Sequence, residues 1–165
     1  MSVMIRPMTS KEFERFYKWS AEHQVKELMK ELHMSQADAI KEALHELARM
    51  LPDGLNTACN HLMSIVVEES EEVVGFIWTI HEETAGRKQS FLCDLAIWEP
   101  KRRKRYATVA LSLAEKNAAE AGCRESVLFV ADRNDAAKAL YGKQGYVFLR
   151  QEGYGSYMIK QLSSV

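Results

Sequence analysis

The chain has 165 residues, of which 47% are hydrophobic and 27% are charged, and its formal net charge is -1. This composition is ordinary for a globular protein that buries one core, and it lacks the overall positive charge of a nucleic-acid binder. Three cysteines, Cys59, Cys93 and Cys123, lack the paired spacing of a disulfide framework or a zinc site. No signal-peptide pattern or membrane-spanning stretch is visible, so we expect a cytoplasmic protein.

The first third of the chain is predicted to be helical. After a short strand at Met4–Met8, the segment Thr9-Ser10-Lys11-Glu12 has the pattern of a capping box. Apolar residues recur at helical spacing as far as Leu32, and Ser35 caps a second amphipathic segment. Leu51-Pro52-Asp53-Gly54 then stops that helix and turns the chain. We expect these helices to frame the acceptor side of a cleft.

The remainder is predicted to alternate between strands and helices, with the polar segment Glu82–Gln89 as a loop. Hairpins imply antiparallel pairing, whereas a strand–helix–strand order implies a parallel pair. We therefore expect an α/β fold of the α+β type, built on a mixed sheet, in a single domain over residues 1–165. The expected strands are His61–Val67, Val73–His81, Phe91–Trp98, Ser126–Val130, Tyr146–Arg150 and Ser156–Leu162, and the expected helices are Ala107–Ala121 and Asp135–Lys143.

A basic loop separates the apolar strand that ends at Trp98 from the helix that begins at Ala107. Residues Lys101–Arg105 are all Lys or Arg. The first turn of a helix has unpaired N–H groups and a favourable dipole, and adjacent cations strengthen the attraction for phosphate. A solvated surface turn and a nucleic-acid patch are the alternatives, although no aromatic residue interleaves the basic run. The position of the loop favours a site for a phosphorylated small molecule.

Two motifs resemble those of the GNAT superfamily of acyl-CoA N-acyltransferases. Arg102-Arg103-Lys104-Arg105-Tyr106-Ala107 is similar to the family's arginine/glutamine-x-x-glycine-x-glycine/alanine motif, and the segment Asn134–Tyr146 is similar to its N-x-x-A-x-x-L-Y-x-x-x-G-F pattern. Val73-Val74-Gly75-Phe76 and Ser156-Tyr157-Met158-Ile159-Lys160 resemble its third and last strands. The resemblance covers about Leu62 to Leu162, with a weaker match at Ile5–Met8. It implies a mostly antiparallel central sheet with helices on both faces, and acetyl-CoA as the co-substrate.

The resemblance also assigns the acyl-CoA site. In the family, the fourth strand splays from the fifth and its backbone pairs with pantetheine, while loop amides hold the pyrophosphate. Arg105 stands where the family usually has a glycine that lets the backbone approach the pyrophosphate closely. Asn134 is explained equally well as the N-cap of the following helix. The predicted cofactor-binding residues are Leu95, Ile97, Arg102, Arg103, Lys104, Arg105, Tyr106, Ala107, Thr108, Asn134 and Tyr141.

Three residues are candidates for proton transfer. The resemblance gives Tyr141 the role of general acid that meets the leaving thiolate, although a tyrosine beside Leu140 is also a common packing residue. Asp94 lies in an otherwise apolar strand, where a carboxylate is costly unless it is paired or hydrated. It is either a structural acid or the base that deprotonates the acceptor amine, and Glu99 at the strand's end competes for that role.

These residues together predict an N-acetyltransferase that joins acetyl-CoA and a primary amine in a ternary complex. The alternatives are a catalytically silent acyl-CoA sensor on the same fold, favoured by Arg105, and, more remotely, an RNA-binding module. We expect no metal, because no cluster has the pattern of a metal site. The expected partner is a small-molecule or peptide amine, with no nucleic acid and no membrane, and the sequence leaves a homodimer open.

Overall fold

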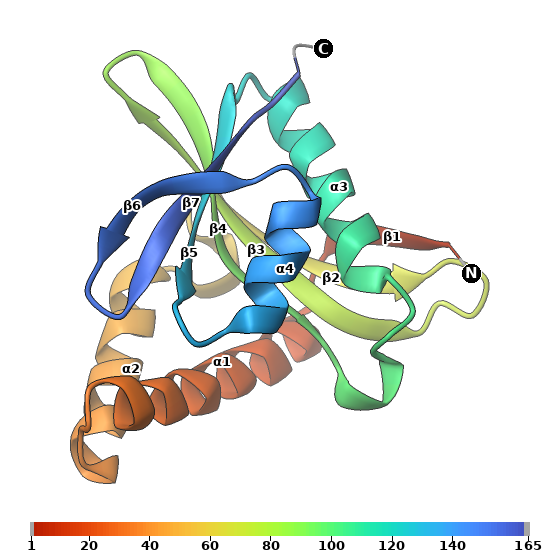
Figure 1. Cartoon of the computed structure of the whole chain (residues 1–165). Helices are drawn as coiled ribbons and strands as arrows, with labels where there is room; N and C mark the ends of the chain where they lie inside the picture. Colours follow the sequence, from red (N-terminus) through yellow and green to blue (C-terminus); the bar gives the residue numbers. More distant parts are fainter. Residues whose placement is uncertain (1, 164–165) are drawn as a thin grey trace. The chain divides into compact units, whose positions relative to one another are not determined.

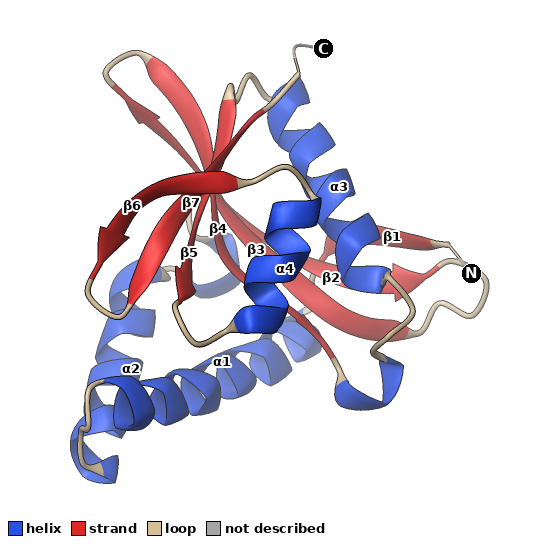
Figure 2. Cartoon of the chain, viewed as in Figure 1, coloured by secondary structure: helices blue, strands red, loops and turns tan. Residues whose placement is uncertain are grey.

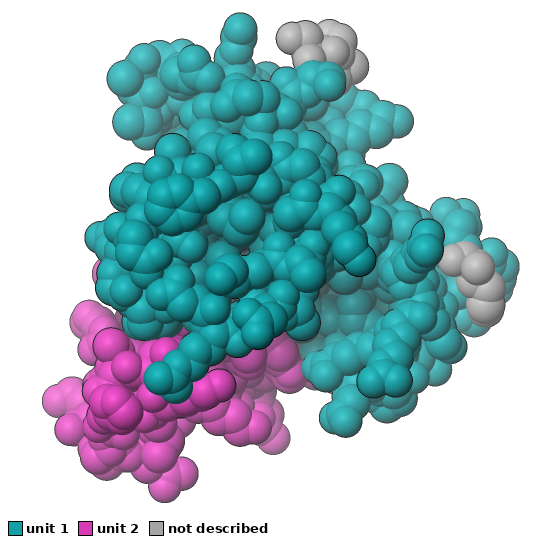
Figure 3. All heavy atoms as spheres, viewed as in Figure 1, with its two compact units in different colours: residues 1–7, 59–165 teal, residues 8–58 magenta. Residues whose placement is uncertain are grey.

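The computed structural model describes residues 2–163, which form two compact units. Unit 2 comprises residues 8–58, and unit 1 comprises the preceding residues and residues 59–165 (Figure 3). The strand preceding unit 2 in the chain belongs to the sheet of unit 1. The prediction of a single domain over residues 1–165 stays a prediction.

Unit 2 is built on two helices, α1 at Ser10–Glu31 and α2 at Gln36–Met50, followed by the short 3-10 turn η1 at Gly54–Asn56. Thr9 begins α1 with the predicted capping box, in which its hydroxyl accepts the Glu12 N–H and its own N–H donates to the Glu12 carboxylate. Ser35 caps α2 in the predicted manner. Small buried residues of α2 pack against α1, with Leu28, Ala39 and Ala43 at the centre of the contact. Neither helix, nor any other in the described chain, is long and apolar enough to cross a membrane.

Unit 1 contains a seven-stranded sheet in the order β1-β2-β3-β4-β5-β7-β6, with the elements arranged as in Figures 1 and 2. Every neighbouring pair is antiparallel except β4 and β5, which are parallel. The predicted mixed and mostly antiparallel sheet is therefore confirmed. The strands are β1 Val3–Pro7, β2 Asn60–Val67, β3 Val73–Thr84, β4 Arg87–Ile97, β5 Glu125–Ala131, β6 Val147–Glu152 and β7 Gly155–Gln161.

The segment Glu82–Gln89 forms most of a hairpin arm, so its prediction as a loop was wrong. Strands β3 and β4 continue through it, with Glu83 opposite Lys88 and Thr84 opposite Arg87. Ala85 and Gly86 make the turn with φ of 52° and 78°, the left-handed geometry that a tight hairpin requires. The polar composition misled the prediction because both faces of this arm are largely accessible to water, so no apolar alternation was needed.

Two helices pack on one face of this sheet. They are α3 at Tyr106–Glu120 and α4 at Asp135–Lys143. Tyr106, Leu111 and Ala114 of α3 share a hydrophobic core with sheet residues, and Tyr141 of α4 packs against the same core. Tyr106, Ala110 and Ala114 are four residues apart, and Leu111 and Ala114 are three apart, so these residues share the face of α3 that packs against the sheet.

At the edge of the sheet, β6 exposes a run of large apolar side chains. Val147, Phe148 and Leu149 are 61%, 63% and 43% exposed. Pairing with β7 shifts register between Phe148 and Arg150, so Leu149 is the extra residue of a bulge.

The strand pair β3–β4 is closely packed where Gly75 lies opposite Ile97. A Cβ added at Gly75 would lie 2.1 Å from the Ala96 carbonyl oxygen, which is backbone and cannot rotate away. We predict that Gly75→Ala lowers the free energy of unfolding by about 1–3 kcal/mol, the usual cost of overpacking. Chemical denaturation measures this change.

Gly142 provides the matched control, because it is exposed in α4 and a Cβ there would meet no atom within 4 Å. Gly142→Ala should raise the free energy of unfolding by roughly 0.5–1 kcal/mol, since alanine loses less backbone freedom in a helix. Equal effects at the two glycines would contradict the close approach at Gly75.

Candidate active site

The candidate site begins where β4 and β5 part. These strands pair only from Gln89–Leu92 to Glu125–Leu128, although both continue beyond these residues. On the other side of β4, Trp78 lies opposite Asp94 and Thr79 opposite Leu92, so Cys93 is the extra residue of a β-bulge. A bulge bends its strand and sharpens the local twist. The bulge therefore lies at the point where β4 turns away from β5, as the sequence resemblance implied for the fourth and fifth strands.

Beyond the bulge, two backbone groups of β4 bind side chains. The Leu95 N–H donates to the Asp94 carboxylate over 3.1 Å, and the Ile97 carbonyl accepts a bond from Arg102 Nε over 2.9 Å. Leu95 and Ile97 are two residues apart, so their backbone groups point to the same side of the strand. This edge of β4 offers one donor and one acceptor to a ligand that displaces the side chains.

A short basic loop leads from β4 to the start of α3. It contains the 3-10 turn η2 at Glu99–Lys101, and then Arg103, Lys104 and Arg105 with exposed side chains. Lys101 forms an ion pair with Glu72 at 2.9 Å, so its charge is already balanced. Arg102 is exposed as well, but its Nε is bound to the Ile97 carbonyl, so Arg103, Lys104 and Arg105 are the cations that the loop presents to solvent beside the helix N-terminus.

The N-terminus of α3 has no side-chain cap. Val109 makes the first backward bond of the helix, to the Arg105 carbonyl at 3.1 Å. Arg105, the N-cap residue, makes no capping hydrogen bond with its side chain. The amides of Tyr106, Ala107 and Thr108 precede Val109 and have no helical carbonyl to bind. The predicted anion site thus has the required donors and adjacent positive charge.

Arg105 retains the backbone geometry expected of the glycine that usually stands at its position. Its φ is 62°, and that of Arg103 is 67°. Both lie in the left-handed region, which glycine adopts readily and other residues adopt at a cost. The path of the loop is therefore that of a glycine-containing turn, with arginine side chains attached to it.

Tyr141 is a half-buried residue on α4. Burial, together with the smaller effect of the nearby Asp94 carboxylate, raises the pKa of its hydroxyl to about 12. A negative charge beside a phenol disfavours the phenolate, so the hydroxyl stays protonated at neutral pH. The charge of Asp94, on the part of β4 that has left β5, therefore acts on the hydroxyl of Tyr141.

Glu99, the competing carboxylate, lies elsewhere. It is exposed on η2, beyond the end of β4, whereas Asp94 is half-buried beside the bulge. Asp94 is the carboxylate whose charge acts on Tyr141. Both assignments as the base stay predictions, and the structure gives Asp94 the more suitable surroundings.

Asn134 is the N-cap of α4, which confirms the first of the two roles predicted for it. Its side-chain oxygen accepts the Ala137 N–H at 3.1 Å. The second role, contact with pantetheine, stays a prediction.

Sequence analysis missed several polar residues near Tyr141. Glu115, Ser126 and Lys160 converge on Tyr146, behind Tyr141, although they come from separate elements. The sequence does contain one sign of this cluster, because Glu115 is an acidic residue on the apolar face of α3, between Leu111 and Ala118.

The residues of this chain match known acetyltransferases. Residues 23–146 match the family model described as the acetyltransferase (GNAT) family. The Bacillus subtilis protein named uncharacterized N-acetyltransferase YycN is 30% identical over 146 residues, which are 88% of this chain and 93% of that protein. A second B. subtilis protein with such a name, YdgE, is 26% identical over 88% of this chain and 92% of its own length.

Solved structures share the fold. A crystal structure of B. subtilis YycN has a TM-score of 0.81 at 28% identity, covering 92% of this chain and 98% of that one. The PaiA N-acetyltransferase of Thermoplasma acidophilum, solved in complex with coenzyme A, has a TM-score of 0.70 at 19% identity and covers 98% of this chain and 99% of its own. The parted strands and uncapped helix thus belong to an acyltransferase fold. The chain is a member of the GNAT family of acetyltransferases.

The left-handed conformation of Arg105 generates a prediction. Arg105→Gly should raise the free energy of unfolding by about 1 kcal/mol, because it removes the steric cost of a side chain at positive φ. Lys104→Gly is the matched control in the same loop, since Lys104 is not among the residues with positive φ. It should instead lower stability through the entropy of the unfolded chain. If thermal denaturation shows both variants to be destabilised equally, Arg105 carries no such strain.

Proposed function

We propose that the protein transfers an acetyl group from acetyl-CoA to a primary amine in one ternary complex. The observation that carries this proposal is the parting of β4 and β5 after Leu92, beside the uncapped and basic N-terminus of α3. One end of the arrangement suits a pyrophosphate, and the other offers backbone groups to an extended amide-bearing arm. Acyl-CoA carries both features in one molecule.

The donor site follows from these contacts. The amides of Tyr106–Thr108 would bind the pyrophosphate, with Arg103, Lys104 and Arg105 adding charge. Leu95 and Ile97 would exchange their side-chain partners for pantetheine and the thioester. Solved proteins of the same fold support this assignment, since PaiA was crystallised with coenzyme A and Arabidopsis thaliana NAA60 with acetyl-CoA.

The chemistry is a direct transfer. The amine nitrogen attacks the thioester carbonyl carbon, a C–N bond forms, and the C–S bond breaks. Asp94 accepts the proton that the amine loses, directly or through water, and Tyr141 donates a proton or hydrogen bond to the departing thiolate. The Leu95 N–H, once released by Asp94, would stabilise the oxyanion. Holding both substrates together supplies much of the rate enhancement.

The acceptor is a primary amine of a peptide, a protein, a polyamine, an amino sugar or a small metabolite. Relatives in fold span several of these classes, because one is the NatC complex bound to a peptide and another is a spermidine N-acetyltransferase bound to spermine. The deciding experiment measures release of free CoA thiol from acetyl-CoA across a panel of such amines. Turnover with any amine supports the enzyme, and acetyl-CoA binding without turnover favours the silent sensor.

Neutralising the basic loop should weaken coenzyme A binding selectively. We predict that Arg103→Gln with Lys104→Gln raises the Kd of coenzyme A roughly tenfold and leaves pantetheine binding unchanged, because pantetheine lacks the phosphates that these charges attract. Titration calorimetry at two salt concentrations measures the loss, which should shrink at high salt.

Lys26→Gln with Lys41→Gln controls for net charge, since these exposed lysines lie in α1 and α2 and the pair removes the same two charges. The proposal for the loop fails if the control weakens coenzyme A equally, or if the loop variant weakens both ligands alike.

Removing the Tyr141 hydroxyl should lower turnover. Tyr141→Phe keeps the ring in the core and removes the proposed acid, so kcat should fall by about 10²-fold with little change in acetyl-CoA affinity. Because the pKa of Tyr141 is raised to about 12, the native enzyme should show no loss of kcat from its ionisation up to about pH 10. Steady-state kinetics and a pH profile measure both effects. Full kcat in a stably folded Tyr141→Phe variant would remove Tyr141 from the mechanism.

A further inference from the structure

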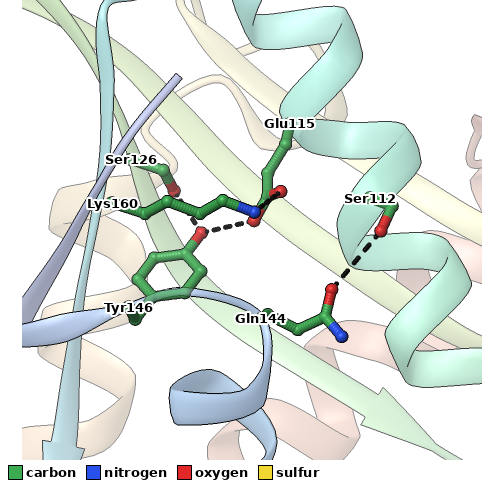
Figure 4. A network of polar contacts seen from close by, with 6 residues as sticks. All are labelled: Ser112, Glu115, Ser126, Gln144, Tyr146 and Lys160. Atoms are coloured by element: carbon green, nitrogen blue, oxygen red, sulfur yellow. Dashed lines mark hydrogen bonds and ion pairs between the residues drawn. The ribbon is translucent and has the colours of Figure 1, made fainter. Parts of the chain in front are cut away.

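A buried polar network surrounds the hydroxyl of Tyr146 (Figure 4), whose ring contacts the ring of Tyr141. Tyr146 is 3% exposed, and its hydroxyl donates to the Glu115 carboxylate over 2.9 Å. The Ser126 hydroxyl lies 2.6 Å from the same phenol oxygen, and Lys160 Nζ lies 2.7 Å from the other Glu115 oxygen. Hydrogen bonds thereby hold the Tyr146 hydroxyl to Glu115 of α3 and Ser126 of β5. The Glu115 carboxylate, which accepts the hydrogen bond from Tyr146, is held in turn by Lys160 of β7.

Tyr146 also holds Tyr141 by two contacts. Its backbone N–H donates to the Tyr141 carbonyl over 3.0 Å, and the two rings meet edge to face with their centroids 5.8 Å apart. Between them, Gly145 adopts a φ of 96°, which folds the chain back at the end of α4. One residue thus joins the end of α4 to three elements of the core.

A gain in folding stability does not by itself explain why this polar network is buried. A buried ion pair such as Glu115–Lys160 often contributes no more than apolar residues of similar volume would. Two directional hydrogen bonds at the hydroxyl oxygen of a buried tyrosine do, however, fix the position and angle of its ring.

We propose that Tyr146 is a positioning residue whose anchored ring holds the Tyr141 hydroxyl at the gap between β4 and β5. This inference rests on the proposed role of Tyr141 as the acid. Packing alone leaves a ring free to shift, and a misplacement of about 1 Å at a reacting group can cost up to 10²-fold in rate. The Glu115, Ser126 and Lys160 partners restrict that shift.

A double-mutant cycle on kcat tests the inference, with an amine found by the thiol-release screen. Tyr146→Phe keeps the ring and removes its anchor, so kcat should fall about tenfold while the KM for acetyl-CoA stays within about twofold. In the Tyr141→Phe background the same change should cost nothing further, because no hydroxyl remains to be positioned. Equal losses in both backgrounds would show a merely structural role and overturn the inference, as would no loss in either.

The single variant Tyr141→Phe separates this inference from the proposed function. If that variant alone keeps full kcat, Tyr141 is not the acid. The positioning role of Tyr146 then fails as well, because there is no catalytic hydroxyl for it to position. Ser112→Ala is the matched control. Ser112 of α3 contacts Gln144, the C-cap residue of α4, at 3.5 Å, and it makes no hydrogen bond to Tyr146. This control variant should leave kcat unchanged.

A second measurement needs no acceptor amine. In protein labelled with ¹³C at the tyrosine ring carbons, the Tyr141 signal is identified by its loss in Tyr141→Phe. It should shift and show faster ring flipping in Tyr146→Phe, and to a lesser degree in Ser126→Ala, which removes one of the two anchors and covers the case that Tyr146→Phe unfolds. An unchanged Tyr141 signal in a folded Tyr146→Phe or Ser126→Ala protein would overturn the inference.

Discussion

The parting of β4 from β5 is the constraint on which the candidate site depends. Four residues of β4 pair with β5, and beyond them the bulge at Cys93 turns the strand aside. On its other edge, β5 pairs with β7 along its whole length, so the edge that faces β4 is the one left open beyond Leu128. Backbone groups that a continuous sheet would consume are therefore left for ligands, and α3 and α4 present their chemistry beside the same gap. The first half of β4 pairs with a strand on each edge, whereas the second half pairs with β3 alone and leaves its other edge to the candidate site.

Electrostatics and backbone strain are balanced against each other in the loop that follows. Arg103 and Arg105 adopt left-handed conformations that glycine would adopt more easily. Glycine would bring the backbone closer to an anion, whereas arginine brings charge that acts over a longer distance and stays ionised at every physiological pH. The loop therefore has the left-handed backbone path that suits glycine, and it also carries the charge of arginine. Arg102 differs from these two arginines, because its Nε donates a hydrogen bond to the Ile97 carbonyl at the end of β4.

Features with local causes could be predicted from the sequence. Thr9, Ser35 and Asn134 cap their helices through bonds to residues three positions away, and such spacing is visible in the chain. The basic loop at a helix N-terminus and the succession of strands and helices along the chain were also predictable. The resemblance of two motifs, rather than any periodicity, pointed to the parting of the strands and to Tyr141.

Features with distant causes could not be predicted. The bulge at Cys93 arises from the register of β3 against β4, which no local pattern specifies. Glu115 meets Tyr146 across 31 positions and Lys160 across 45, so the sequence gives no sign that these groups share one hydrogen-bonded cluster. The hairpin arm was missed because its charged residues pair across strands, as Glu83 and Lys88 do, without an apolar face.

The edge strand β6 has a consequence for solubility. Val147, Phe148 and Leu149 give it the composition of a strand that recruits another chain, and an unpaired edge of this kind is a common start of aggregation. The bulge at Leu149 interrupts the regular spacing of donors and acceptors that an incoming strand would need. Arg150 adds a charge directly after the apolar run, held over the Tyr157 ring at 4.3 Å. The irregularity and the cation together act as gatekeepers, so the edge carries its apolar residues without offering a flat template for fibril growth.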